Sequence, residues 1–128
     1  MNNNKKWSLL FIKDENSKFD LQTKAFNALF SKVDMVLGRQ EALHLFDKND
    51  YDIVIGDISI KPEELAFLKQ IKDKKFEQTI FALVAPKDTD KLYGIADLGL
   101  HAIELTPTQF EEALEMIAQF NPYEENKN

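Results

Sequence analysis

Acidic side chains that follow short apolar segments are the best candidates for chemistry in this 128-residue chain. Asp14 and Glu15 come after the first such segment, and Asp57 comes after the third. The chain has no cysteine, which excludes thiolate catalysis and Cys-based metal sites. Its two histidines, His44 and His101, are too scattered to suggest a His-rich metal centre. Carboxylates are therefore the only plausible metal ligands.

Short apolar segments rich in β-forming residues alternate with amphipathic segments. The apolar segments predict strands at residues 9–12, 33–37, 53–55 (with Tyr51 as an alternative start), 79–85 and 102–105. This alternation is typical of a parallel sheet covered on both faces. It predicts an α/β, flavodoxin-like, doubly wound three-layer sandwich with a five-stranded parallel sheet and five helices. Polar residues after the strands should then meet at the crevice formed by the carboxyl ends of the strands.

The helical segments show apolar residues at helical spacing. The first three are marked by Leu21, Ala25, Ala28 and Leu29, by Ala42, Leu43 and Phe46, and by Leu65, Leu68 and Ile71. We expect the fourth helix to start near Asp88 and end at Gly99, and to be the least secure because of its internal Gly94. The fifth should begin with a capping box from Thr108 to Glu111.

The composition is that of one globular domain, with 44% apolar and 30% charged residues. We expect a single domain over residues 1–128, with a core at about residues 7–120 and loose ends. No apolar segment has the length of a membrane span or a signal peptide, so we expect a cytoplasmic protein without a membrane partner. A net charge of -6 argues against nucleic acid. A protein or a small cation is the favoured partner.

Three segments resemble the receiver domain of two-component response regulators. Residues 52–60, Asp-Ile-Val-Ile-Gly-Asp-Ile-Ser-Ile, resemble the strand that leads into the family's phosphoacceptor aspartate, here Asp57. Residues 40–43, Gln-Glu-Ala-Leu, resemble the start of its second helix. Residues 99–107, Gly-Leu-His-Ala-Ile-Glu-Leu-Thr-Pro, resemble its fifth strand and the proline that follows. The resemblance covers nearly the whole chain and implies the doubly wound fold and a role in signal transduction.

The chain departs from the family's phosphorylation site at several positions. Lys13 and Asp14 stand where the family has two acids that hold Mg²⁺. Val84 replaces a serine or threonine hydroxyl after strand four, and Thr106 replaces a lysine after strand five. The aromatic switch position and the Met-Pro pair beyond the phosphoacceptor also differ, and they read Ile103 and Ile60-Lys61, with the proline displaced to Pro62.

These departures weaken the chemistry that the resemblance implies. Phosphoryl transfer needs cations and donors that stabilise charge on the phosphoryl oxygens, and a lysine at an acidic position repels Mg²⁺. Asp14, Asp57 and the Ser59 carbonyl leave a weak metal site at best. Lys13 either pairs with Asp57 in place of the metal, lowering the pKa of that carboxyl, or points to solvent. Alternatively, Asp14-Glu15 is the acid pair in a shifted register.

We therefore expect a stand-alone degenerate receiver, or pseudo-receiver, that signals by binding another protein independently of phosphorylation at Asp57. The resemblance implies a partner surface on helix four, strand five and helix five that includes Tyr93, Ile103 and Glu112. We expect no cofactor and no enzymatic activity beyond autocatalytic phosphotransfer. One alternative is a phosphorylation-competent single-domain response regulator, which accepts phosphate on Asp57 from a histidine kinase and needs Mg²⁺. Another is a dimerisation or scaffold module that acts as a homodimer.

Overall fold

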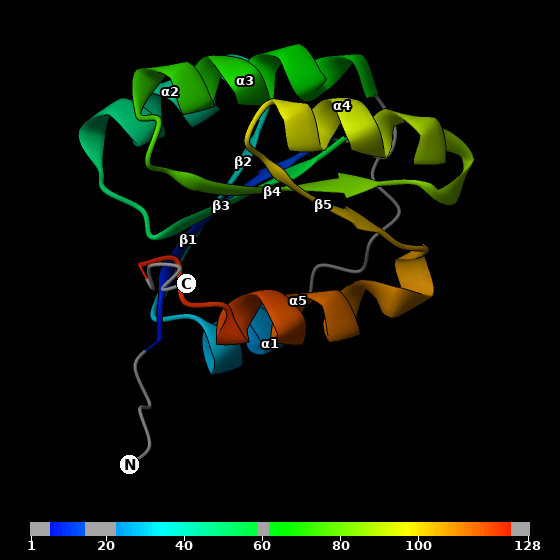
Figure 1. Ribbon diagram of the computed structural model, residues 1–128. Coiled ribbons are helices and arrows are strands. Elements are labelled where there is room, and N and C mark those ends of the chain that lie inside the picture. The colour runs from blue at the N-terminus through cyan, green and yellow to red at the C-terminus, as the bar shows by residue number, and fades with distance from the viewer. Residues whose placement is uncertain (1–5, 15–22, 59–61, 124–128) are drawn as a thin grey trace.

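A parallel sheet of five strands forms the middle layer of the protein (Figure 1). A computed structural model describes residues 6–14, 23–58 and 62–123. The strands lie in the order β2-β1-β3-β4-β5, and all neighbouring pairs are parallel. Their bounds are β1 Ser8–Lys13, β2 Lys32–Leu37, β3 Ile53–Asp57, β4 Thr79–Val84 and β5 His101–Glu104. The predicted doubly wound sheet is confirmed, and each strand lies within two residues of its expected bounds.

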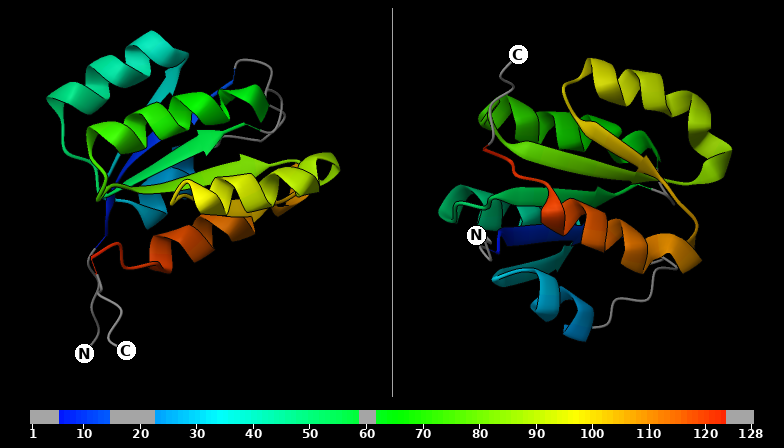
Figure 2. Two further views of the ribbon diagram at one scale, coloured as in Figure 1. Left: turned by 45° about the horizontal axis from the view of Figure 1, so that its top comes forward. Right: turned by 60° about the horizontal axis from the view of Figure 1, so that its bottom comes forward.

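Helices cover both faces of the sheet, which gives the three predicted layers. Helices α2, α3 and α4 lie on one face, and α1 and α5 lie on the other (Figures 1 and 2). Their bounds are α1 Thr23–Leu29, α2 Arg39–Lys48, α3 Leu65–Lys74, α4 Leu92–Asp97 and α5 Phe110–Gln119, and 3-10 turns at Pro62–Glu64, Pro86–Lys91 and Pro107–Gln109 precede the last three. Leu21 of the first predicted helix lies outside the described residues. Among the described helices, none has the length and apolar character needed to cross a membrane.

Two separate cores form because side chains alternate between the faces of each strand. Leu10 of β1 and Val54 of β3 point into the core beneath α2, α3 and α4. Leu9 and Ile55 point into the opposite core, which packs against α1 and α5. All five residues of β3 are buried, since this strand has a neighbour on each side and helices over both faces.

The fourth helix is shorter than predicted. The expected start near Asp88 is wrong, because the α-helical residues begin at Leu92 and a 3-10 turn comes first. The backbone N–H of Asp88 donates to the carbonyl of Ala85, and Asp88 itself has non-helical angles of φ -109° and ψ 29°. This turn uses the residues that were expected to form the first turn of the α-helix. The C-terminal prediction holds, since Gly99 follows the helix with φ +80°, which glycine adopts readily.

The predicted capping box of the fifth helix is also wrong. Thr108 lies inside the 3-10 turn, and the residue that caps α5 is Gln109, whose side chain makes no capping hydrogen bond to the helix. Instead, the Gln109 Oε1 atom accepts a hydrogen bond from the backbone N–H of Thr106 at 2.8 Å. The proline at 107 favours this arrangement, since it starts a helical turn without needing a hydrogen-bond acceptor for its own nitrogen.

A polar network lies at the amino-terminal ends of the central strands β1 and β3. One oxygen of Asp52, Oδ2, accepts hydrogen bonds from the backbone N–H and the hydroxyl of Ser8. The other oxygen accepts the hydroxyl of Tyr123, whose ring also lies 5.7 Å from that of Trp7, centroid to centroid. Burial, the hydrogen bond to Asp52 and the charges of Asp52 and Asp50 raise the pKa of Tyr123 to about 12. Tyr123, although expected to lie in a loose end, thus ties the end of the chain to the sheet.

We predict that Gly56→Ala destabilises the protein by about 1–3 kcal/mol. A Cβ at this position of β3 would lie 2.5 Å from Cδ2 of Leu68, which is almost fully buried in α3. Gly94→Ala is the matched control, because nothing lies within 4 Å of its added Cβ in α4, and it should stabilise by about 0.5–1 kcal/mol. Urea denaturation measures both, and a Gly56→Ala effect as small as that of Gly94→Ala would contradict the close packing.

We predict that Tyr123→Phe costs about 1 kcal/mol of stability at pH 8, through loss of the hydrogen bond to Asp52. Because the folded-state pKa of Tyr123 is raised, this contribution is complete below pH ~10 and falls as the pH rises towards about 12. Urea denaturation followed by circular dichroism should therefore show a smaller difference between Tyr123→Phe and the unmodified protein at pH ~11. An undiminished difference at that pH would contradict the assignment.

Candidate functional site

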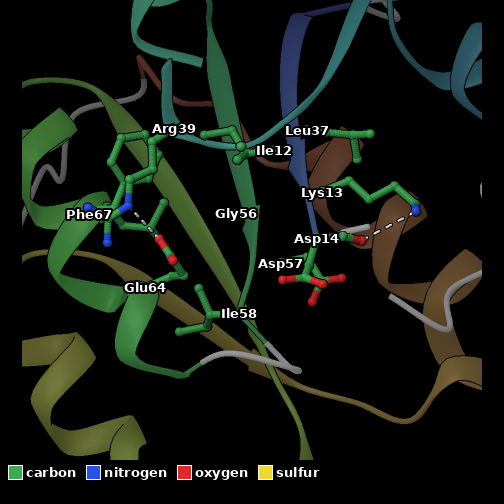
Figure 3. Close-up of a pocket in the computed structure, with 12 residues that line it drawn as sticks. Ile12, Lys13, Asp14, Leu37, Arg39, Gly56, Asp57, Ile58, Glu64 and Phe67 are labelled. Atoms are coloured by element: carbon green, nitrogen blue, oxygen red, sulfur yellow. Dashed lines mark hydrogen bonds and ion pairs between the residues drawn. The ribbon is translucent and has the colours of Figure 1, made fainter. Parts of the chain in front are cut away.

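A cavity of ≈ 280 Å³ opens where β1, β2 and β3 end (Figure 3). This is the crevice at the carboxyl ends of the strands that the fold predicts. Its walls come from three strand ends, the start of α2 and the start of α3. The described residues that line it are Ile12, Lys13, Asp14, Leu37, Gly38, Arg39, Gly56, Asp57, Ile58, Glu64, Phe67 and Leu68.

Asp57 and Asp14 lie together at this cavity, as the sequence predicts. Asp57 is the last residue of β3 and retains 5% of its surface exposure. Ile12 pairs with Gly56 across β1 and β3, so the residues that follow them in each chain segment lie close to one another. β1 extends through Lys13, one residue beyond its predicted end, and Asp14 follows it directly. Glu15 and Ser59 lie outside the described residues, so a shifted acid pair and a metal-binding Ser59 carbonyl stay predictions.

Lys13 does not form the ion pair with Asp57 that was considered from the sequence. Its ammonium donates to the backbone carbonyl of Asp14 at 3.3 Å, and Figure 3 shows the side chain extending away from Asp57. No ion pair between Lys13 and Asp57 occurs among the described residues. Lys13 is partly exposed, so its ammonium keeps part of its hydration in this position, some of which it would lose on moving to the buried Asp57 carboxylate.

The ends of β4 and β5 contribute neither Val84 nor Thr106 to the cavity. Val84 is buried in the core beneath α2, α3 and α4. The Thr106 hydroxyl lies 3.0 Å from the hydroxyl of Thr108 and 3.2 Å from Oε1 of Gln109, so it is directed to the start of α5. The cavity lining therefore includes Lys13, Asp14 and Asp57 and does not include Val84 or Thr106, although Val84 follows Leu83, the strand partner of Asp57.

The described residues contain no group of three or more histidine, aspartate or glutamate side chains placed to hold a metal ion. Asp14 and Asp57 are the two carboxylates of the predicted weak site, and both line the cavity. Carboxylates suit Mg²⁺, but its octahedral shell usually takes one or two of them together with water and a phosphate oxygen. A metal at this place would depend on such additional ligands.

The opposite wall of the cavity was missed in the sequence. Arg39 Nε donates to Oε1 of Glu64 at 3.1 Å, and the Arg39 guanidinium lies 5.6 Å from the ring centre of Phe67. Arg39 lies two residues after the end of β2, so applying the strand-end criterion to that strand as well would have found it. No local pattern marks Glu64 or Phe67, because they enter the cavity only through the packing of α3 against the sheet.

The predicted partner surface lies at the β5 edge of the sheet, with α4 and α5 on either side (Figure 1). Ile103 is half-buried on β5 and packs against the core near α5. Glu112 is exposed in the first turn of α5. Tyr93 belongs to α4, and its side chain is outside the described part of the chain.

Comparisons with known proteins identify the fold. No protein-family model matches the chain, and no curated protein matches it. A response regulator receiver domain protein from Clostridium thermocellum superposes with a TM-score of 0.63 at 20% identity, over 87% of this chain and 93% of that one. An adenylate cyclase structure from Rhodopirellula baltica superposes with a TM-score of 0.60 at 14% identity, over 85% of this chain and 84% of that one. The chain therefore has the fold of a response-regulator receiver domain.

Proposed function

We propose that this receiver-fold domain acts in signal transduction by binding a protein partner, and that its action does not depend on phosphorylation of Asp57. The main support is the geometry at the end of β5, where the Thr106 hydroxyl bonds to the start of α5 and no ammonium stands in its place. The buried, apolar Val84 at the end of β4 adds no hydroxyl. A phosphoryl group on Asp57 would lack both partners that the receiver resemblance assigns to these positions.

The charge of a phosphoryl group makes these losses severe. A phosphoaspartate carries about two negative charges at the end of a buried strand, where neutralisation by cations and hydrogen-bond donors decides its stability. Lys13 is among the residues that line the cavity, but the hydrogen bond of its ammonium to the Asp14 carbonyl directs it away from Asp57 (Figure 3). The site is thus better suited to keeping Asp57 as a carboxylate than to holding its phosphorylated form.

The exposed face of α5 supports binding of a protein partner. Glu112 and Met116 are four residues apart, which places them on one side of α5, and Phe120 caps the C-terminal end of this helix. Met116 is 59% exposed and Phe120 36% exposed, unusual for large apolar side chains. The ring of Phe120 packs against Phe81 of β4 and His101 of β5, so the exposed apolar side chains at α5 reach the β5 edge strand.

A second candidate function is a phosphorylation-competent receiver that accepts a phosphoryl group from a histidine kinase. It is favoured by the place of Asp57, at the end of the central buried strand, lining a cavity beside Asp14. Metal-dependent labelling of Asp57 distinguishes it from the first proposal. A dimerisation or scaffold role through the exposed α5 face is distinguished by the oligomeric state in solution.

We predict that Mg²⁺ at about 1 mM leaves the melting temperature unchanged, because the Lys13 ammonium opposes a second cation beside Asp14 and Asp57. In the Lys13→Asp variant, the melting temperature should rise with the concentration of Mg²⁺, since a ligand that binds only the folded state stabilises it. Lys6→Asp, an exposed substitution near the opposite end of β1, is the control and should give no such rise. Scanning fluorimetry measures all three proteins, and a Mg²⁺-dependent rise in the unmodified protein would contradict the proposal.

We predict that acetyl phosphate with Mg²⁺ leaves the intact mass of the protein unchanged. The triple variant Lys13→Asp, Val84→Thr and Thr106→Lys should gain at least partial labelling, because it supplies the missing ligand, hydroxyl and cation. Single substitutions should gain much less, since groups that act together are not additive.

Adding Asp57→Asn to the triple variant is the control and should abolish its labelling. One phosphoryl group on Asp57 of the unmodified protein would overturn the proposal in favour of the phosphorylation-competent receiver. An unlabelled triple variant would count against the assignment of these positions to a receiver site.

A further inference from the structure

β2 is the longer of the two edge strands of the sheet. It has six residues, whereas β5 at the other edge has four. Among the described residues, β1 is the only strand that pairs with β2, so the backbone groups on the outer side of β2 have no strand partner there. Proteins usually protect such an edge by a short strand, a proline or a charged side chain. Short length protects β5 in this way but does not protect β2.

One face of β2 carries an exposed apolar row. Side chains alternate between the faces of a strand, which places Val33, Met35 and Leu37 on the same face. Met35 is 40% exposed and Leu37 is 51% exposed, whereas Val33 packs partly against the core beside α1 and α5. Two large apolar side chains that are exposed on an unpaired strand edge favour pairing with a further strand.

The charged side chains of β2 lie on its other face and are engaged within their own chain. The Lys32 ammonium lies 3.6 Å from Oδ2 of Asp34 and 5.6 Å from the ring centre of Tyr51. The Tyr51 hydroxyl donates to the same oxygen of Asp34. Tyr51 belongs to the core beneath α2, α3 and α4, so these contacts hold the Lys32 charge on the face opposite the apolar row. The lysine of this strand therefore leaves the row unprotected.

We propose that β2 pairs with β2 of a second copy of this chain, antiparallel and about a two-fold axis at Met35. Both copies then use the same edge, as a two-fold dimer requires. Met35 lies opposite the Met35 of the second copy, and Val33 lies opposite Leu37, so the apolar row meets itself. Asp34 lies opposite Val36, and no two like charges face each other directly.

The charges of the strand select this register. In a two-fold antiparallel pair, opposite side chains lie on the same face of the sheet, so the axis passes through a residue. Within β2, an axis at Asp34 aligns residues 32–36 of both copies and an axis at Met35 aligns residues 33–37, whereas other axes align fewer. The axis at Asp34 would place two carboxylates directly opposite each other, which is destabilising. A strand that matches itself in this way favours a second copy as the occupant.

This association is separate from partner binding at α5, because β2 and β5 are opposite edges of the sheet. Pairing of one short edge strand buries less area than the roughly 1,200–2,000 Å² of a stable interface. We therefore expect a weak, reversible dimer that forms at protein concentrations of about 10–500 µM.

Sedimentation equilibrium over this concentration range should show a monomer–dimer equilibrium for the unmodified protein. Met35→Lys should raise the dimer Kd at least about tenfold, because it places two ammonium groups opposite each other at the axis. Met116→Lys, at an exposed methionine of α5, is the matched control and should change the Kd less than about twofold. A monomer at every concentration, equal effects of the two substitutions, or dissociation by Met116→Lys alone would overturn the proposal.

The absence of cysteine from the chain allows the register to be tested by oxidation. Directly opposite residues of antiparallel strands have Cα atoms about 4.5–5.5 Å apart, a distance that a disulfide spans. Oxidised Met35→Cys should therefore form a covalent dimer. Leu37→Cys is the control on the same face, because in this register its two copies lie about 14 Å apart along the strands. No covalent dimer of Met35→Cys, or one formed as readily by Leu37→Cys, would contradict the register.

Amide hydrogen exchange tests the interface without any substitution. Raising the concentration of the unmodified protein from about 10 to about 500 µM should slow exchange at the outward N–H groups of β2. Exchange in β5, the other edge strand, should stay the same. Slower exchange in β5 alone, or in neither edge strand, would overturn the proposal and would leave partner binding at α5 to be judged by its own tests.

Discussion

All five strands are parallel, so every connection must pass over a face of the sheet, and every carboxyl end arrives at the same edge. The central strands β1, β3 and β4 are therefore buried by apolar side chains on both faces, and the two polar networks described above lie at the ends of the strands. The amino-terminal edge holds the Asp52 network, which joins the first strand to the end of the chain through Ser8 and Tyr123. The carboxyl-terminal edge holds the cavity with Asp57.

The close approach of α3 to β3 determines the shape of that cavity. Gly56 has no side chain, and Leu68 of α3 occupies the space that a Cβ would need. This contact brings the start of α3, with Glu64, to the same cavity as the end of β3, with Asp57. Gly56, one residue before the buried Asp57, therefore contributes to the site through packing. It lets α3 approach β3 closely enough to form the cavity wall that includes Glu64.

The charges at the cavity show how burial decides between competing interactions. Lys13 and Asp57 are neighbours at the ends of paired strands, yet the ammonium bonds to a backbone carbonyl and does not pair with the carboxylate. Arg39 and Glu64 do pair, at the more exposed wall, where less hydration is lost. The crevice holds Asp14 and Asp57. At the positions where the receiver resemblance has a second acid, a hydroxyl and a lysine, the chain has Lys13, Val84 and Thr106.

The sequence alone determined the parallel sheet, the alternation of strands with helices, and the meeting of Asp14 and Asp57. Short apolar segments and helical apolar patterns are local, and the carboxyl ends of the strands converge in this fold. Tertiary structure decided the rest. The direction of Lys13 depends on its hydrogen bond to the Asp14 carbonyl, which no sequence spacing reveals. The helix starts at Leu92 and Phe110 were displaced by 3-10 turns whose hydrogen bonds, such as that from Thr106 to Gln109, compete with the expected caps. Glu64 and Phe67 reach the cavity only through the packing of α3 on Gly56, a contact between segments that no local pattern encodes.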